Sequence, residues 1–282
     1  MNFRMQVVWF DLFGLDSNAY VLETAHNIFI IDTNVADVQQ EMDAALANCD
    51  LTKPVTILNT HGHWDHTSLN GYLKERYGAV ICAHPGARAL QLDPEGQFDL
   101  IYGRYLALHP EDDGILRAYT HYFQYPAPPD RPLTGGEVFE DDGFRLRVIP
   151  TPGHSTDSIS FYEEVSGILF GGDCVQGRGQ GVNAPYYSHA EPYLQSLRTI
   201  AALRPTALMN AHAQAQGQEE TARFLERSAA AWADIDDAVR AAAPRSEAEI
   251  PALAGRIAEQ FGWRNGMHVL TTVASHAQFV LI

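Results

Sequence analysis

The chain has 282 residues, of which 46% are hydrophobic, and this size suits one large α/β domain or a domain with an added lobe. Nineteen Lys and Arg residues against 35 Asp and Glu give a formal net charge of −16, and the sequence contains no basic cluster, so a nucleic-acid partner is not expected. There is also no run of about 18 apolar residues that would predict a membrane span.

Three cysteines, Cys49, Cys82 and Cys174, form no C-x-x-C pair, and their odd number argues against a disulfide framework. This usage is typical of a reducing compartment. The first residues show no apolar segment followed by small residues at a cleavage site, which is the pattern of a secretory signal. We therefore expect a cytoplasmic protein.

The first third of the chain alternates short apolar runs with turns. Strands are expected at residues 6–10, 19–23, 28–32, 55–58 and 80–83. Turns are expected at residues 14–18 and 25–27. One helix is expected at residues 36–47, and a second begins with Thr67 or Ser68 as its cap and ends at Gly78. This alternation predicts a layered α/β fold.

A segment from about Pro85 to Pro132 interrupts the alternation. It is rich in aromatic residues between Phe98 and Tyr125, and it ends in a proline-rich stretch that predicts a stiff connector. One interpretation is a helical insertion that covers a site, and the other is a helical pair that packs as ordinary core. The residues leave both interpretations open.

The second half of the chain returns to strands and then becomes helical. Strands are expected at residues 137–140, 144–149, 158–162, 168–170 and 207–210, and helices at 193–203 and 219–242. Ser246, with Glu249 three residues later, resembles a capping box that starts another helix. We expect a main domain over residues 1–242 and a C-terminal helical extension over 243–282 that packs on it. The extension could instead close over the site or join two subunits, and the second option would make a homodimer.

The residues from His61 to His66 form the pattern H-x-H-x-D-H directly after the apolar strand at 55–58. Its potential metal ligands are His61, His63, Asp65 and His66. So many ionisable groups are costly to bury unless a metal ion compensates them. His61 and His63 alternate across one residue and can turn towards one metal, while Asp65 and His66 can reach a second.

Three more strand ends carry ligand-type residues. His154 follows the strand at 144–149 in a Pro-Gly turn, and Asp173 follows a Gly-Gly pair after the strand at 168–170. His212 lies two residues beyond the strand at 207–210. Each residue is a weak signal by itself, but four strand ends that all offer a ligand together predict a metal site.

In their order along the chain, these motifs resemble the metallo-β-lactamase fold superfamily. The resemblance implies a four-layer αββα sandwich over residues 1–242, with a helical insertion at about 85–132 and C-terminal helices. It implies that His61, His63 and His154 hold one metal, that Asp65, His66 and His212 hold a second, and that Asp173 bridges the two. Asp32 resembles the strand-end Asp that lies beneath the metal loop in this superfamily. One departure is Ala213, since members often have Gly after the last His.

A dinuclear site of this kind predicts hydrolysis. Two divalent cations about 3.5–4 Å apart can share a hydroxide, lower the pKa of water towards neutrality and polarise a carbonyl or phosphoryl oxygen. Zn²⁺ is the expected metal, although Fe or Mn would also suit these ligands. Asp65 is the expected catalytic residue, because it can bind a metal and also orient the nucleophile or carry a proton. We predict hydrolysis of a carboxylic ester, thioester or lactone in a small-molecule substrate that has an apolar or aromatic part.

The motifs leave four other functions open. The missing basic patch disfavours a phosphodiesterase, and the missing export signal disfavours a β-lactamase. A persulfide-dioxygenase-like oxidoreductase shares the hexapeptide but uses a single iron. A non-catalytic ligand-binding protein would keep the same fold. Metal content would separate the hydrolase from the iron enzyme.

Overall fold

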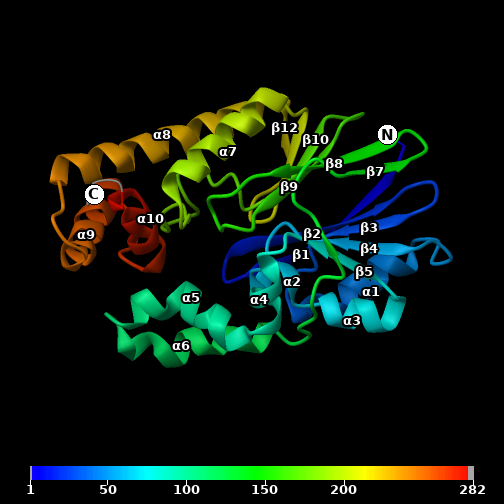
Figure 1. Cartoon of the computed structure of the whole chain (residues 1–282), viewed down its shortest axis with the longest axis horizontal. Helices are drawn as coiled ribbons and strands as arrows, with labels where there is room; N and C mark the ends of the chain where they lie inside the picture. The colour runs from blue at the N-terminus through cyan, green and yellow to red at the C-terminus, as the bar shows by residue number, and fades with distance from the viewer. Residues whose placement is uncertain (1, 279–282) are drawn as a thin grey trace.

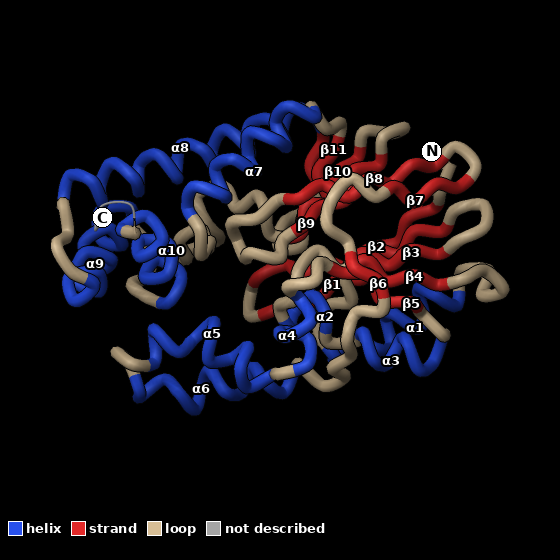
Figure 2. The backbone as a smooth tube through the Cα atoms, in the orientation of Figure 1, coloured by secondary structure: helices blue, strands red, loops and turns tan. Residues whose placement is uncertain are grey.

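The computed structural model of the chain describes residues 2–278, except for the side chains of Ile115, Ala118 and Tyr119. Two six-stranded sheets lie face to face, and helices cover the outer face of each sheet (Figures 1 and 2). The αββα sandwich implied by the motifs is therefore confirmed.

The first sheet comes from the first half of the chain, in the order β1-β2-β3-β4-β5-β6. Its strands are β1 (Arg4–Leu12), β2 (Leu15–Glu23), β3 (Ile28–Ile31), β4 (Val55–Leu58), β5 (Val80–Ala83) and β6 (Arg131–Pro132). Strands β1 to β3 pair antiparallel, and β3 to β6 pair in parallel. The segments between them form η1 (Ala36–Val38), α1 (Gln39–Ala47), α2 (Trp64–Thr67) and α3 (Asn70–Tyr77).

The second sheet comes from the second half of the chain, in the order β12-β11-β10-β9-β8-β7. Its strands are β7 (Val138–Asp141), β8 (Phe144–Pro150), β9 (Ile159–Glu163), β10 (Ile168–Gly172), β11 (Ala207–Asn210) and β12 (Gln216–Gly217). Strand β9 is antiparallel to both β8 and β10, and β11 is parallel to β10, so β8, β10 and β11 all run in one direction. Helices α7 (Ala190–Leu203) and α8 (Gln218–Ala242) cover this sheet.

Strand β3 shows how the layers are specified. Its four residues are all buried, and successive side chains point to opposite faces of the sheet. Ile28 and Ile30 pack in the cluster that includes Met42 of α1, whereas Phe29 and Ile31 pack in the cluster between the two sheets. A strand that is apolar on both faces is typical of a sheet covered on both sides.

Two groups of helices lie beyond one end of the sheets (Figure 1). The insertion forms α4 (Ala87–Leu92), α5 (Pro94–Leu106), η2 (Pro110–Asp112), α6 (Asp113–Arg117) and η3 (Ala118–Tyr122). The C-terminal part forms η4 (Glu247–Glu249), α9 (Ile250–Phe261) and α10 (Met267–Ala277). The two groups touch, because Met267 packs against the cluster of Phe98, Ile101 and Tyr102. Residues 279–282 of the expected extension lie outside the described part.

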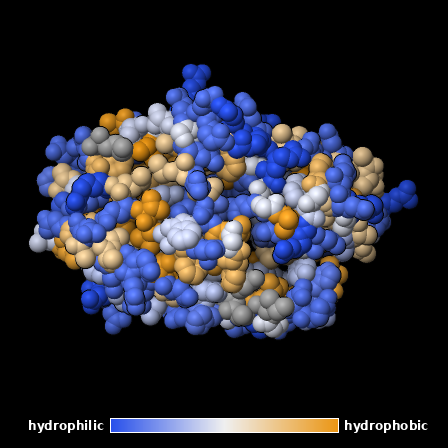
Figure 3. Space-filling view, turned by 180° about the vertical axis from the view of Figure 1, so that it is seen from behind, coloured by the Kyte–Doolittle hydropathy of each residue, from blue (hydrophilic) through white to orange (hydrophobic). Residues whose placement is uncertain are grey.

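Hydrophilic residues cover most of the face seen in Figure 3, and apolar residues interrupt them in patches. The most exposed large apolar side chains of the described residues are those of Leu100, Val165 and Phe13, at 69%, 62% and 61%. Within residues 2–278, no helix is both long and apolar enough to cross a membrane.

The turn expected at residues 14–18 is wrong. Strand β2 already begins at Leu15, which pairs with Leu12, so the hairpin turn is only Phe13 and Gly14. Both have positive φ, 56° and 84°, as a tight two-residue hairpin requires. The polar residues Ser17 and Asn18 misled the prediction, since they are buried strand residues with tertiary hydrogen bonds.

One of two expected helix starts is also wrong. Thr67 and Ser68 do not cap a helix that begins there, because their hydroxyls donate to the carbonyls of His63 and Trp64 within α2. Helix α3 starts only at Asn70, although it ends at Gly78 in a left-handed conformation as expected. Ser246 is the N-cap of η4, which continues directly into α9, so this predicted start is confirmed. The capping box itself does not form, because the Ser246 hydroxyl donates to the Glu249 carboxylate and caps no backbone N–H.

Candidate metal centre

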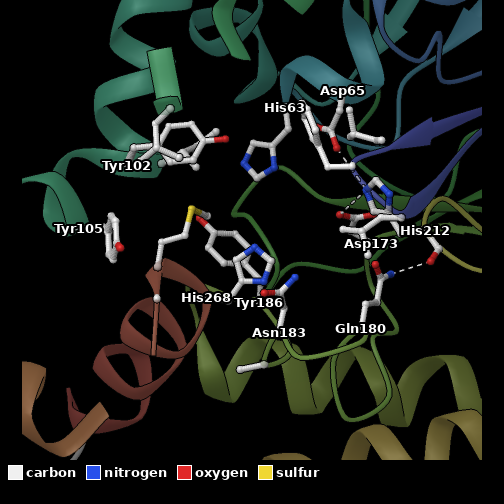
Figure 4. A pocket seen from close by; sticks show the side chains of 18 of the residues that line it. His63, Asp65, Tyr102, Tyr105, Asp173, Gln180, Asn183, Tyr186, His212 and His268 are labelled. Carbon is white, nitrogen blue, oxygen red and sulfur yellow. Dashed lines mark hydrogen bonds and ion pairs between the residues drawn. The ribbon is translucent and has the colours of Figure 1, made fainter. Parts of the chain in front are cut away.

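The seven candidate ligands meet at one edge of the sandwich, because the strands that precede them end at that edge. His61, His63, Asp65 and His66 follow β4, and the others follow β8, β10 and β11. Three groups of three residues bring their ligand atoms within 4.8 Å of one another. These groups are His61, His63 and His154; His61, His66 and Asp173; and Asp65, His66 and His212. Four of these residues line a cavity and are labelled in Figure 4: His63, Asp65, Asp173 and His212.

In the first group, three imidazole nitrogens converge. Nε2 of His154 lies 3.1 Å from Nε2 of His61 and 3.0 Å from Nδ1 of His63. Nitrogens bound to one tetrahedral zinc lie about 3.3 Å apart, given zinc–nitrogen bonds of about 2.0–2.1 Å. The spacing of the group is therefore close to that of three ligands on one ion.

Hydrogen bonds fix which nitrogen of His61 and His154 carries the proton. Nδ1 of His154 lies 3.0 Å from the Tyr186 carbonyl, which can only accept, and 3.1 Å from Nε2 of Gln176. Because Nε2 of Gln176 can donate instead to the Asp173 carbonyl at 3.2 Å, we assign the proton to Nδ1 of His154, which donates to Tyr186. Thr60 Oγ1 donates its proton to the Asp32 carboxylate, so it accepts from Nδ1 of His61 at 3.1 Å. In both residues Nε2 then presents its lone pair to the centre of the group, as metal binding requires.

The group of Asp65, His66 and His212, called the second group from here on, combines imidazoles with a carboxylate. Nε2 of His212 lies 3.2 Å from Oδ2 of Asp65, and Nε2 of His66 lies 3.7 Å from the same oxygen. Asp173 reaches both groups: its Oδ2 lies 3.4 Å from Nε2 of His154 and of His212, and its Oδ1 lies 3.6 Å from Nε2 of His66. This is the position expected of a bridging carboxylate.

The first group is electrically neutral. Burial lowers the pKa of His63 and of His154 to about 4, and it lowers the pKa of His61 well below its usual value. At pH 7 the three imidazoles therefore carry lone pairs instead of charge, and this is the form that binds a metal ion.

The second group is charged. Burial alone would raise the pKa of Asp65, but His66 and His212 hold it at about 2. Burial likewise opposes charge on His212, yet Asp173 and Asp65 raise its pKa to about 10, and Asp65 and Asp32 raise that of His66 well above the usual value. The neighbouring carboxylates thus stabilise positive charge at this buried position.

Two buried atoms, Nε2 of His66 in the second group and Oδ1 of the neighbouring Asp173, have no hydrogen-bond partner among the described residues. A buried polar atom without a partner is costly, and an ion is one of the few groups that can satisfy it. Imidazole nitrogens together with carboxylate oxygens are ligands for zinc, iron and manganese. The residues therefore fit divalent metal ions.

Asp32 lies behind this set and orients it. Its φ is 56°, its side chain is buried, and it accepts hydrogen bonds from the Thr60 amide at 2.7 Å and from Nδ1 of His66 at 2.8 Å. The contacts agree with the interpretation of Asp32 as the residue beneath the metal loop. They also leave Nε2 of His66 free for a metal.

A cavity of about 430 Å³ opens over the two groups. His63, Asp65, His154, Asp173 and His212 form one wall, and helices α5, α6 and α10 form the opposite side (Figure 4). The opposite side is largely apolar and aromatic, with Ile101, Tyr102, Tyr105, Leu116 and Met267. The insertion therefore covers the site, and Phe98, Ile101 and Tyr102 also form a packed cluster of their own. Both interpretations of the segment hold in part.

A family model described as the metallo-beta-lactamase superfamily matches residues 12–212, a span that holds all seven candidate ligands. The chain belongs to this superfamily. The atrochrysone carboxyl ACP thioesterase of Aspergillus fumigatus is 28% identical over 189 residues, which are 66% of this chain and 47% of that protein. The thioesterase pkgB of Emericella nidulans is 34% identical over 190 residues, 67% of this chain and 43% of that protein. The chain spans about half the length of the curated relatives it matches.

Solved structures of metallo-beta-lactamase proteins share the fold over nearly the whole chain. A family protein from Thermus thermophilus aligns with a TM-score of 0.75 and 22% identity, over 98% of this chain and 92% of that one. A beta-lactamase domain protein from Burkholderia ambifaria aligns with a TM-score of 0.70 and 20% identity, over 99% and 86%. At such identities the likeness concerns the fold alone.

The superfamily motifs did not predict every residue of the cavity. Gln176, Gln180, Asn183, Arg264 and His268 also line it. His268 lies at the start of α10, and its ring packs against that of Tyr186 with centroids 5.3 Å apart. A lone His in an amphipathic helix gives no sequence signal for such a position.

The aromatic and histidine residues of the loop between Asp173 and α7 divide between the cavity and the core. Tyr186 lines the cavity. Tyr187 is buried and stacks on Tyr193 with ring centroids 4.2 Å apart, and His189 only precedes α7. Ala213, in the place of the frequent Gly, is not among the residues with positive φ, so its backbone conformation does not require glycine.

Proposed function

We propose that this chain is a dinuclear metal-dependent hydrolase of a carboxylic ester, thioester or lactone, with a thioester as the favoured substrate. The observation that carries the proposal is the pair of ligand groups joined by Asp173 beneath an apolar and aromatic cavity. The relatives named thioesterases support the choice of bond.

In this proposal His61, His63 and His154 hold one cation, Asp65, His66 and His212 hold the other, and Asp173 contacts both. Zinc is the expected metal, and iron or manganese would find suitable ligands too. When bound, two such cations supply Lewis acidity for a carbonyl oxygen and make water acidic enough to react at neutral pH.

Asp65 has a second role in the proposal. It lines the cavity, its side chain is 15% exposed, and its Oδ2 is oriented by His212 at 3.2 Å. The low pKa keeps its carboxylate ionised at pH 7, so it can take a proton from the attacking water as the bond to the carbonyl carbon forms, and pass that proton to the leaving group as the bond to it breaks. This dual use explains why Asp65 is the candidate ligand that the chain leaves most open to the cavity.

The opposite side of the cavity selects the substrate. Ile101 and Tyr102 of α5 and Met267 of α10 offer apolar surface to an acyl group, and its burial there excludes water from the reacting carbonyl. Tyr186 and His268 lie side by side at the same cavity (Figure 4). A small molecule with an apolar or aromatic acyl part fits this lining best.

A panel of thioesters, esters and lactones with matched acyl groups tests the proposal. The zinc-loaded chain is expected to hydrolyse thioesters fastest, to lose the activity with a chelator and to regain it with zinc. No turnover on the whole panel at full metal occupancy would favour a non-catalytic ligand-binding protein. One iron per chain together with oxygen consumption on a persulfide would favour the oxidoreductase.

A further inference from the structure

One peptide group connects the C-terminal helix α10 to the candidate ligand His154. Its carbonyl, that of Tyr186, accepts the hydrogen bond from Nδ1 of His154 at 3.0 Å. Its N–H, that of Tyr187, donates to Oγ1 of Thr272 in α10 at 3.2 Å. Because a peptide group is planar and rigid, Thr272 at one end constrains the acceptor of His154 at the other.

Thr272 is fully buried, and its hydroxyl is used on both sides. It donates to the Pro185 carbonyl at 2.7 Å while it accepts from the Tyr187 amide. On the other side of the same loop, the Ser188 hydroxyl donates to the His154 carbonyl at 2.9 Å. The loop from Pro185 to Ser188 is therefore tied both to α10 and to the segment that carries His154.

A second set of contacts holds this loop from within the core. His276 of α10 is fully buried, and its Nδ1 lies 3.2 Å from the Asp236 carboxylate, which can only accept. Its Nε2 therefore carries the lone pair and accepts from the Tyr187 hydroxyl at 2.8 Å. Neither Tyr187 nor His276 lines the cavity, so neither can act on a substrate directly.

We propose that Thr272 is a positioning residue of the metal centre. Through the Tyr186–Tyr187 peptide it keeps His154 in the tautomer whose Nε2 points to His61 and His63. The contacts of Tyr187 with His276 support the same loop from behind. The family match ends at residue 212, and α10 lies outside it. We therefore infer that a helix outside the matched region supports the group of His61, His63 and His154. The inference rests on the proposed metal-dependent function.

Thr272→Val and Thr272→Ser test the role of the hydroxyl, because valine keeps the shape without the oxygen and serine keeps the oxygen. Ser275→Ala is the matched control: it removes a buried hydroxyl of the same helix that bonds only to the Thr272 carbonyl. Zinc affinity is measured by competition with a chromophoric chelator, and thermal unfolding of the metal-free chain is measured beside it.

Thr272→Val is expected to weaken one of the two zinc sites by about 10–100-fold, the range typical when the group that orients a ligand is lost. Thr272→Ser and Ser275→Ala should stay within about threefold of the native affinity. If Thr272→Val binds both zinc ions as the native chain does, the positioning role is overturned, even if the variant is less stable. A native chain that binds no zinc would instead refute the proposed function itself.

Tyr187→Phe covers the case in which Thr272→Val does not fold. This change keeps the ring stacked on Tyr193 and removes only the hydroxyl that bonds to His276. A several-fold loss of affinity at one site is expected, since the loop loses one of its two anchors on α10. Native affinity in Tyr187→Phe would then contradict the proposal.

Discussion

The proposed function gives the Asp65 carboxylate two roles: its negative charge binds a metal ion, and it accepts a proton during the reaction. Asp65→Asn keeps the size of the side chain and removes both. We expect kcat to fall by at least about 100-fold, as is usual when a group that transfers protons is lost. Metal content is measured on the same sample to separate chemistry from binding. A fully active variant with both metals bound would contradict the role of Asp65 in proton transfer.

Gly172 has a φ of +54°, and a Cβ at this position would lie 2.5 Å from Oγ1 of Thr60. Thr60 bonds to Asp32 and to His61, so Gly172→Ala is expected to disturb the ligand set as well as to strain the backbone. Gly181, at φ +57°, has no atom within 4 Å of such a Cβ and makes a matched control.

Gly181→Ala should therefore lose only about 1–2 kcal/mol of unfolding free energy, the cost of a left-handed conformation. Gly172→Ala should lose more and should also bind zinc more weakly. Chemical unfolding and zinc competition measure the two effects. Equal losses in the two variants would mean that the contact with Thr60 does not matter.

At the scale of elements, a buried carboxylate stabilises the contact between strands β1 and β2 of the first sheet. Glu23 at the end of β2 bonds to Arg4 of β1, to Nζ of Lys53 at 2.8 Å and to the Asp50 amide at 3.0 Å. Burial disfavours its charge, but these partners lower the pKa of Glu23 from 4.5 to about 2.

Because the folded pKa of Glu23 lies below the unfolded value, its stabilisation is complete above about pH 4.5 and is lost as the pH falls towards 2. The difference in unfolding free energy between the native chain and Glu23→Gln should therefore be largest near pH 7 and should shrink below pH 4.5. Urea unfolding across this range measures it. Glu219→Gln, at an 85% exposed side chain, should differ little at any pH. A difference for Glu23→Gln that does not vary with pH would refute the assignment.

The sequence predicted most elements because each carries a local signal. The apolar run at residues 55–58, for example, predicts a buried strand without reference to the rest of the chain. Gly78 likewise ends its helix because glycine adopts the left-handed conformation at little cost. The turn between β1 and β2 was misplaced because Ser17 and Asn18, which look like turn residues, form strand contacts with residues far along the chain. Such a polar strand is stabilised only by its tertiary partners.

The candidate site divides in the same way. His61 to His66, His154, Asp173 and His212 were found because each stands directly after a strand, and strand ends meet at one edge. The contributions of Thr272 and His268 could not be found, since they depend on where α10 docks. Thr272 meets Tyr187 across 85 residues of sequence, and no spacing rule reaches that far.

At the scale of the whole molecule, the candidate metal ligands come from both sheets, because they follow β4 of one sheet and β8, β10 and β11 of the other. The unfolded chain has no such site, so metal binding stabilises the fold. At metal concentrations of about 1,000 times Kd, the gain is about 4 kcal/mol for each filled site, so two filled sites should raise the unfolding temperature by roughly 20 °C. Calorimetry with and without a chelator measures it. An unchanged unfolding temperature would show that the ligand groups are not filled.

Titration of the metal-free chain with zinc, with thioester turnover measured at each step, tests directly whether this chain is a dinuclear hydrolase. Activity should stay low through the first equivalent and reach a plateau at two zinc ions per chain, and Asp65→Asn should be inactive at the same occupancy. Full activity at one metal per chain, or none at two, would contradict this proposal.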